Sequence, residues 1–219
     1  MLIAVPLTDK NFEDGLKACK ELGADIVELR VDMFQDADVN HLRELIKKIH
    51  NTGLRNILTI RSEKEGGKHV PNRLKLFEEL SPISDYTDLE LSSEGIISKV
   101  RDIVKAHDKK LILSYHNFER TPPRWILKEI FREARRWGAD IVKVAVRADS
   151  YEDVATLLCM GKEEEGEKIL ISMGSVGSIS RLAGFIFGSV ISYAFVGQAV
   201  AEGQIPLEEM VRLRRLFYG

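Results

Sequence analysis

The sequence predicts an α/β protein built as a (β/α)8 barrel, in which a closed ring of parallel strands is surrounded by helices. Short β-branched runs alternate with longer amphipathic stretches along the whole chain. Such strict alternation indicates parallel strands joined by right-handed crossovers. The 219 residues, 44% of them hydrophobic, are close to the size of one barrel. We therefore expect a single domain over residues 1–219.

The expected strands are short runs rich in Val, Ile, Leu and Tyr, each bounded by charged or turn-forming residues. In chain order they span residues 2–7, 25–31, 56–61, 85–91, 110–116, 140–146, 168–173 and 190–196. The expected helices fill the gaps, at residues 10–22, 38–51, 71–80, 95–107, 122–137, 150–165, 177–187 and 206–217.

Glycine and proline positions agree with these helix bounds. Gly23 and Gly138 follow two expected helix ends, where glycine readily adopts the left-handed conformation. Pro122, Pro123 and Pro206 stand at expected helix starts, where the missing N–H of proline is tolerated.

An open, doubly wound sheet is the competing architecture. Such sheets usually carry a glycine-rich phosphate loop directly after the first strand. The first expected strand here runs into "PLTDKNFEDG", which has no such loop. This difference favours the barrel.

Composition argues against several classes of protein. The formal net charge is -2, so the chain has no strongly basic surface for nucleic acid. The N-terminal "MLIAVPLTDK" lacks the features of a signal peptide, and the apolar stretch "LAGFIFGSVISYAFVG" is too short and interrupted to span a membrane. We therefore expect a cytoplasmic protein with neither nucleic-acid nor membrane partners.

The cysteines carry no metal or redox spacing. Cys19 and Cys159 lie far apart in the chain, and we expect both to be small buried helix residues. High charge with little Asn or Gln is typical of thermophilic proteins, in which a disulfide would remain an option.

The run "DIVKVAV", residues 140–146, places Lys143 in the middle of an apolar strand. A buried lysine is unfavourable unless it is paired or neutral. Because strand residues alternate between the lumen and the helices of a barrel, an inward Lys143 shares its face with Ile141 and Ala145.

The same alternation brings further polar side chains into the lumen, mostly near the carboxyl ends of the strands, where barrel active sites assemble. On successive strands the inward sets are Glu28 with Arg30, Thr59 with Arg61, Ser114 with His116, and Ile171 with Met173.

The glycine-rich "MGSVGSISR", residues 173–181, follows the seventh expected strand. Glycines that lead into a helix expose backbone N–H groups, which is typical of an anion site, and barrels often bind phosphate near this position. Arg181 would add a cation there.

Purely structural interpretations remain open for each of these residues. Glu28 and Arg30 could form a buried ion pair, and Lys143 could pair with Glu28 as barrel filler. His116 could be a core histidine, and Arg181 an ordinary surface charge.

Taken together, the residues predict a barrel enzyme with an amine nucleophile, a general base and an anion site. A lysine that an apolar pocket and neighbouring cations keep neutral can attack a ketone or aldehyde. A histidine can move protons at neutral pH. Chemistry beside an imine carbon suits both groups, and aldol cleavage and dehydration both remain open.

Five segments, taken in their order and spacing, resemble the type I 3-dehydroquinate dehydratases. They are "RSEKEGG" (61–67), "SYHNF" (114–118), "IVKVAV" (141–146), "ISMGSVGSISR" (171–181) and "GQ" (203–204). The similarity extends from "ELRVD" (28–32) to the C-terminal helix. The resemblance implies a homodimeric barrel enzyme of the shikimate pathway that converts 3-dehydroquinate to 3-dehydroshikimate by loss of water. It also implies that neither a metal nor an organic cofactor takes part.

The resemblance assigns roles residue by residue. Lys143 would form a Schiff base with the substrate ketone, His116 would move the protons, and Glu65 would orient His116. Arg181 would bind the substrate carboxylate. The remaining implied substrate contacts are Glu28, Arg30 and Arg61 on the ring hydroxyls, Met173 against the ring, and Gln204 from a closing loop.

This chain departs from the family pattern in that loop. "QAVAEGQ", residues 198–204, has Val200 where a serine is common and Glu202 where a proline is common, so a lid hydrogen bond from a serine hydroxyl is not expected.

Two functions are alternatives to the dehydratase. One is a class I aldolase that uses the same lysine on a phosphorylated sugar, and the other is an inactive barrel that serves as a binding module.

Overall fold

The strands of the computed structural model form one parallel sheet within the described residues, 1–199 and 202–219. The order is β7-β6-β5-β4-β3-β2-β1-β8-β9. The bounds are β1 Leu2–Leu7, β2 Ile26–Arg30, β3 Arg55–Thr59, β4 Tyr86–Glu90, β5 Lys110–Asn117, β6 Ile141–Arg147, β7 Glu167–Met173, β8 Ile191–Phe195 and β9 Ile205–Pro206.

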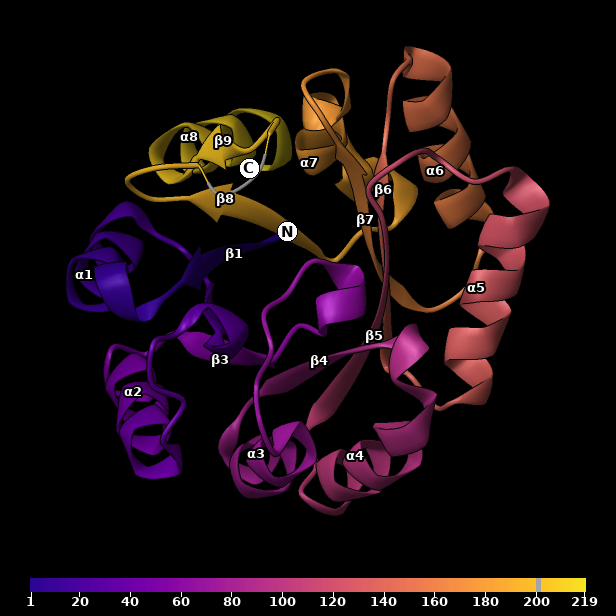
Figure 1. Ribbon diagram of the computed structural model, residues 1–219. Coiled ribbons are helices and arrows are strands. Elements are labelled where there is room, and N and C mark those ends of the chain that lie inside the picture. Colours follow the sequence, from indigo (N-terminus) through magenta and orange to yellow (C-terminus); the bar gives the residue numbers. More distant parts are fainter. Residues whose placement is uncertain (200–201) are drawn as a thin grey trace.

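The sheet closes on itself between β7 and β8. Val190 N donates to Lys168 O at 2.8 Å, and Lys168 forms a parallel bridge with Ser189. Helices surround the strands, and the two termini lie near each other (Figure 1). The predicted (β/α)8 barrel is confirmed.

Most helices match the predicted ranges to within a few residues. They are α1 Phe12–Leu22, α2 Val39–Asn51, α3 Arg73–Leu80, α4 Glu94–Ala106, α5 Arg124–Arg136, α6 Tyr151–Glu163, α7 Ser180–Ala183 and α8 Leu207–Tyr218. Gly23 ends α1 with φ 91° and donates its N–H to Cys19 O, as expected of a glycine at that position.

The predicted helix over 177–187 is wrong. Two 3₁₀ turns, η6 Val176–Ile179 and η7 Gly184–Phe187, flank the short α7 in its place. Glycine is a poor helix former, and Gly177 packs so tightly that a Cβ there would lie 2.2 Å from Ser172 O. The two-residue strand β9, which pairs with β8, was also not predicted, because so short a run has no periodicity.

The predicted third strand extends too far. β3 ends at Thr59, and the backbone N–H of Arg61 donates to the side chain of Asp32 at 3.2 Å instead of continuing the ladder. Arg61 therefore follows the strand as part of the loop above it.

Alternate strand residues divide the core into two layers. Outward residues such as Val142 and Val144 pack against the helices. Inward residues form a smaller apolar cluster in the lumen, which includes Ile141 on the amino-terminal side of Lys143 and Ala145 on its carboxyl side. The predicted alternation around Lys143 is confirmed, and polar side chains join the inward apolar residues toward the carboxyl ends of the strands.

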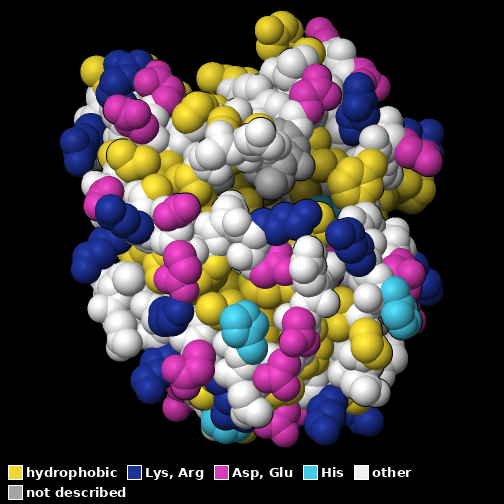
Figure 2. Space-filling model, turned by 60° about the vertical axis from the view of Figure 1, so that its left-hand side comes forward, with side chains coloured by type: hydrophobic (Ala, Val, Ile, Leu, Met, Phe, Trp, Pro, Cys, Tyr) yellow, Lys and Arg dark blue, Asp and Glu magenta, His cyan; other side chains and the backbone are white. Residues whose placement is uncertain are grey.

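Side chains of both charges are interspersed with hydrophobic ones over the face in Figure 2.

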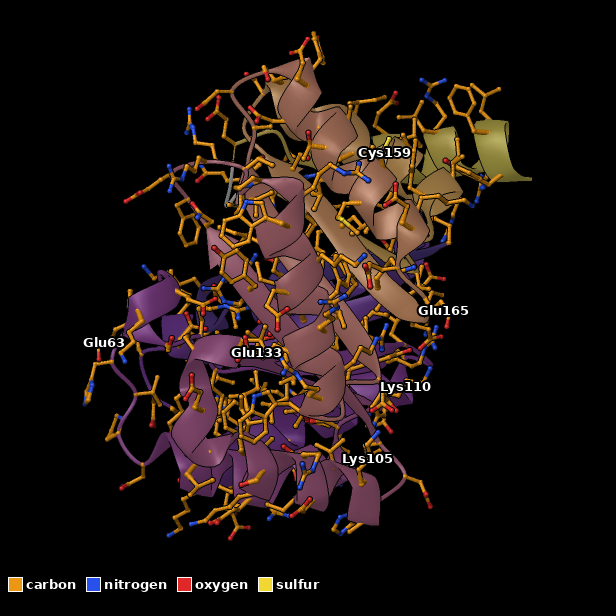
Figure 3. All side chains as sticks on the ribbon, turned by 90° about the vertical axis from the view of Figure 1, so that its right-hand side faces the viewer. Glu63, Lys105, Lys110, Glu133, Cys159 and Glu165 are labelled. Carbon is orange, nitrogen blue, oxygen red and sulfur yellow. The ribbon has the colours of Figure 1, made fainter. Side chains whose placement is uncertain are left out.

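Cys19 is buried, which raises the pKa of its thiol to about 12, whereas Cys159 is exposed on α6 (Figure 3). Both are free, so the expectation of burial is wrong for Cys159, which lies on the solvent side of its helix.

No helix of the described residues has both the length and the apolar character needed to cross a bilayer.

Candidate active site

The carboxyl ends of the strands surround a cavity of about 330 Å³, a size that suits a small molecule. The structure brings together every residue that the resemblance singled out. The wall of the cavity contains Glu28, Arg30, Arg61, Glu65, His116, Lys143, Met173, Arg181 and Gln204.

Lys143 lies at the base of this cavity with its side chain 5% exposed. Its Nζ donates to Asp88 Oδ2 at 2.7 Å and to Tyr193 Oη at 3.1 Å, and Glu28 Oε1 lies 3.7 Å away. We expected cations beside Lys143. This expectation is wrong for the groups within hydrogen-bond or ion-pair distance of its Nζ among the described residues. Carboxylates from β2 and β4 occupy those positions, because their inward-facing residues point at the centre of the lumen.

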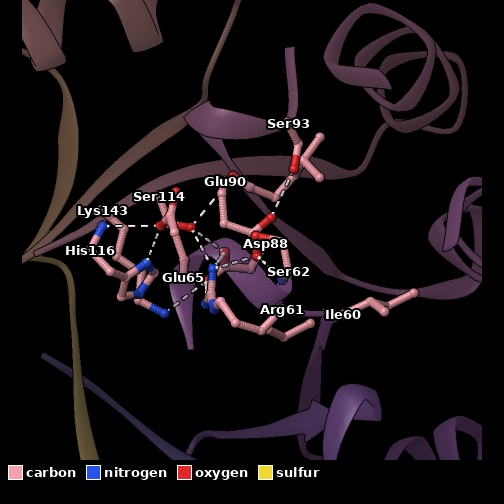
Figure 4. Close-up of polar contacts among 12 residues, drawn as sticks. Ile60, Arg61, Ser62, Glu65, Asp88, Glu90, Ser93, Ser114, His116 and Lys143 are labelled. Atoms are coloured by element: carbon pink, nitrogen blue, oxygen red, sulfur yellow. Dashed lines mark hydrogen bonds and ion pairs between the residues drawn. The ribbon is translucent and has the colours of Figure 1, made fainter. Parts of the chain in front are cut away.

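Asp88 links Lys143 to Arg61 (Figure 4). Arg61 donates to Asp88 Oδ1 at 3.2 Å, to Glu90 Oε1 at 2.9 Å and to Ser114 Oγ at 2.8 Å. Burial alone would raise the pKa of Asp88, but the charges of Arg61 and Lys143 hold that pKa well below its usual range. Asp88 is therefore a fixed negative charge, and much of the hydrogen-bonding capacity of Arg61 is engaged within the protein.

His116 and Glu65 form a second buried pair. Glu65 Oε2 lies 2.8 Å from His116 Nδ1 and accepts the His116 backbone N–H at 3.1 Å, while Ser92 donates to the other carboxylate oxygen. With Glu65 ionised, Nδ1 carries the proton and Nε2 is the basic nitrogen. Burial, then the charges of Arg61 and Lys143, lowers the pKa of His116 well below 6.5.

Arg181 is a buried cation without a carboxylate partner among the described residues. Its Nη1 reaches the backbone oxygen of Ser172 at 3.5 Å, and its Nε has no hydrogen-bond partner. Burial lowers the pKa of the guanidinium to about 10, so it is still charged at neutral pH. A desolvated cation on a cavity wall is a ready site for an anion.

Glu28 and Arg30 do not pair with each other, so the interpretation of them as one ion pair is wrong. Arg30 donates to both oxygens of Asp32, at 3.0 and 2.8 Å. Glu28 accepts from Thr59 Oγ1 at 2.8 Å. Alternate residues share a face of the strand, but each side chain finds a nearer partner on another segment.

The loop that carries Gln204 rests on the turn after β7. Gly203 has φ 77°, and a Cβ there would lie 2.2 Å from Gly174 O. This close packing, which only glycine allows, holds Gln204 at the cavity mouth. Val200 lies outside the described residues, and Glu202 is exposed.

Sequence reasoning missed three lumen residues, Asp88, Glu90 and Tyr193. The signal for the two acids was present, because they alternate with apolar residues on the same face as Tyr86. Tyr193 gave no signal, since a tyrosine within "ISYAF" is typical of an ordinary strand core.

One cavity at the carboxyl end of the barrel holds a lysine paired with a carboxylate, a histidine paired with a second carboxylate, and an arginine with no carboxylate partner among the described residues. This arrangement defines a lysine-centred (β/α)8 barrel enzyme. The chain belongs to the type I 3-dehydroquinase family, whose profile matches residues 3–219. The resemblance stated from the sequence is therefore confirmed.

Similar proteins cover the chain from end to end. It is 62% identical to the 3-dehydroquinate dehydratase of Aquifex aeolicus, over 100% of this chain and 99% of that protein. It is 54% identical to the Hydrogenobaculum sp. enzyme of the same name, over 100% and 99% of the two chains. The crystal structure of the Aquifex aeolicus enzyme matches with a TM-score of 0.97, over 100% and 99% of the chains. The type I enzyme of Clostridium difficile, solved with covalently modified comenic acid, matches at 28% identity with a TM-score of 0.90, over 98% and 91%.

Proposed function

We propose that this chain removes water from 3-dehydroquinate, giving 3-dehydroshikimate, through a Schiff base on Lys143. The observation that carries the proposal is that Lys143, His116 and Arg181 line one small cavity. The relatives named 3-dehydroquinate dehydratase support the choice of substrate. This reaction is a step of the shikimate pathway.

Lys143 supplies the covalent step. Its neutral amine attacks the ketone carbon, and loss of water leaves an iminium. The iminium withdraws electrons from the neighbouring C–H bond and so makes that proton acidic. The buried position of Lys143 excludes bulk water from the nitrogen, and the fixed charge of Asp88 stabilises the positive iminium that forms.

His116 then moves two protons. Its Nε2 removes the acidified proton and becomes part of an imidazolium. The imidazolium then donates a proton from Nε2 to the departing hydroxyl, which leaves as water. Glu65 holds Nδ1–H in place at 2.8 Å, which keeps Nε2 aimed at the cavity and stabilises the imidazolium between the two transfers. Hydrolysis of the remaining imine releases the conjugated product.

Arg181 binds the substrate carboxylate in this scheme. The guanidinium gains a carboxylate partner, which none of the described residues supplies. Glu28 and Arg30 hydrogen bond to the ring hydroxyls, Met173 packs on the ring and Gln204 covers it from the loop. Arg61 contributes chiefly by holding Asp88 and Glu90 in position.

The product tests this proposal directly. The enzyme should convert 3-dehydroquinate to a conjugated enone, which is followed by its strong ultraviolet absorbance. Lys143→Met should abolish the signal. Lys168→Met is the matched control, because Lys168 is also buried but lies at the other end of the barrel, where it donates to Glu164 O. Two carbonyl fragments in place of an enone would indicate an aldolase instead.

We also infer that the enzyme acts in the cytoplasm as a homodimer, as the family resemblance implies. Three large apolar side chains on η7 and α8 support self-association: Ile186, Leu216 and Phe217 are 63%, 66% and 62% exposed. Sedimentation equilibrium should give twice the mass of one chain, and a monomer mass at micromolar protein would contradict the inference.

A further inference from the structure

Tyr193 brings a hydroxyl group to the nucleophile from β8. The side chain is buried in the lumen, and its ring centroid lies 4.5 Å from Lys143 Nζ. Tyr193 Oη accepts from Lys143 Nζ at 3.1 Å and donates to Glu28 Oε1 at 3.5 Å. The direct distance between Lys143 Nζ and Glu28 Oε1 is 3.7 Å. The hydroxyl therefore connects the amine to a carboxylate that the amine does not hydrogen bond directly.

The two carboxylates near Lys143 differ in their ability to take a proton. Asp88 accepts from Arg61 and Ser114 as well as from Lys143, and these partners favour its ionised form. Glu28 accepts from Thr59 and Tyr193, and Lys143 is the one cation within ion-pair distance of it among the described residues. Glu28 therefore has fewer cationic contacts than Asp88, and the hydrogen-bond path from Lys143 through Tyr193 leads to it.

We propose that Tyr193 is a catalytic residue that relays protons between Lys143 and Glu28 while the Schiff base forms and breaks. The inference rests on the function proposed above. In the first step the ammonium of Lys143 gives a proton to Tyr193 Oη as the Tyr193 hydroxyl proton passes to Glu28. The result is a neutral amine, a neutral phenol and a protonated Glu28.

The relay closes the proton balance of imine formation. The amine nitrogen bonds to the ketone carbon, and its surplus proton moves to the former ketone oxygen, giving a neutral carbinolamine. Glu28 then returns its proton through Tyr193 to the carbinolamine hydroxyl. The C–O bond breaks, water leaves, and the nitrogen lone pair forms the C=N bond of the iminium. Glu28 ends ionised, as it began, and hydrolysis of the product imine runs the same steps in reverse.

The surroundings of Tyr193 suit a relay and not a store of negative charge. Burial, followed by the charges of Glu28 and Asp88, raises the pKa of the Tyr193 phenol well above 10. A tyrosinate is therefore unfavourable, and the hydroxyl must receive one proton as it gives up another.

Tyr193→Phe tests the hydroxyl while keeping the ring against Lys143. The rate of imine formation is measured in a His116→Ala background, where later steps stall. The reaction is quenched with borohydride at short times, and the adduct is quantified by mass spectrometry of the intact protein. We expect Tyr193→Phe to form the adduct about 10²-fold more slowly, which is the lower end for loss of one acid–base group. Tyr86→Phe is the matched control and should leave the rate unchanged. Its hydroxyl lies at the opposite end of the lumen and accepts from Arg55 at 2.9 Å.

The other end of the relay provides the second test. Glu28→Gln should slow adduct formation at saturating substrate to a similar degree, and the double variant should be no slower than either single variant, because both remove one path. If Tyr193→Phe fails to fold, Glu28→Gln alone carries this test.

The outcomes separate the relay from the function on which it rests. The relay is overturned if Tyr193→Phe forms the adduct at the rate of its parent, or if the two substitutions multiply as independent contributions would. If even the otherwise unaltered enzyme forms no adduct with 3-dehydroquinate, the proposed function is overturned and the relay falls with it.

Discussion

At the residue scale, burial sets the protonation of His116. Because its pKa lies well below 6.5, the neutral form that acts as a base persists as the pH falls through 6.5 and is lost only at lower pH. We therefore expect the acidic limb of the kcat/KM profile to lie below pH 6.5. The measurement is the rate of enone formation at low substrate over a pH series. A limb centred at or above 6.5 would show that His116 is not held neutral, or is not the base.

Arg181 should give the site its preference for an anionic ligand over a neutral one. A hydrogen bond to a charged group contributes about 1.5–3 kcal/mol, so Arg181→Ala should weaken binding of a carboxylate-bearing substrate analogue by about 10- to 100-fold. The analogue with an uncharged amide in place of the carboxylate should bind weakly to both proteins. Isothermal titration measures both. Arg147→Ala serves as the control, because Arg147 pairs with Asp149 on the surface. Equal binding of the two analogues to the unaltered enzyme would refute the assignment.

The sequence predicted individual residues well where a polar side chain interrupts an apolar strand. Lys143 and His116 were found in this way, and strand alternation placed both in the lumen. The partners of these residues were harder to find. Asp88 comes from a strand that is distant in sequence from β6, and its contact with Lys143 depends on the closed barrel and not on any local pattern.

At the element scale, the turn η6 fixes where α7 begins and hence where Arg181 points. A Cβ on Gly177 would lie 2.2 Å from Ser172 O, so Gly177→Ala must displace the turn from β7. We expect a loss of about 1–3 kcal/mol in the free energy of unfolding, typical of overpacking, and a raised Michaelis constant. Gly95→Ala in α4 is the control, because a Cβ there meets nothing within 4 Å. Urea unfolding and steady-state kinetics test both, and equal behaviour of the two variants would rule out the constraint.

Element boundaries were predictable where hydrophobic periodicity is long and glycine or proline marks the ends, as in α1 and α5. The segment 177–187 misled because its apolar residues have helical spacing. Its conformation follows instead from close tertiary contacts. Besides the contact of Gly177 with β7, a Cβ added to Gly184 would lie 3.3 Å from Ser189 Cβ. Such tertiary contacts override local preference and leave no local signal.

At the scale of the whole molecule, Arg214 of α8 ties the end of the chain to its beginning. It bonds to Asp25 Oδ2 at 2.5 Å, to Gly23 O at 3.0 Å and to Met1 O at 3.3 Å. Arg214→Ala should therefore lower the free energy of unfolding by about 1.5–3 kcal/mol, since charged hydrogen bonds are lost next to β1 and β2. Arg212→Ala on the same helix removes an exposed ion pair with Glu209 and should change the free energy of unfolding by less than about 1 kcal/mol. Urea unfolding measures both variants. An equal loss of unfolding free energy in the two would show that the Arg214 contacts with Met1, Gly23 and Asp25 do not stabilise the fold.

The barrel itself was the most predictable feature, because every strand–helix repeat contributes to the same pattern. The active site depends on that closure. Residues from β2, β4, β6 and β8 meet at Lys143 only when the sheet closes, which explains why one lysine in one strand could be noticed but its surroundings could not be read from the sequence.

Lys143 is the covalent nucleophile of the proposed mechanism. The most direct measurement is sodium borohydride reduction during turnover of 3-dehydroquinate, followed by tryptic digestion and mass spectrometry. We expect a substrate adduct on the peptide of residues 137–147, which trypsin leaves uncut at Lys143 because it does not accept the modified side chain. Lys143→Met should give no adduct, and Lys168→Met should still give the adduct on Lys143. An adduct on any other lysine, or enone formation without any trapped adduct, would show that Lys143 is not the nucleophile.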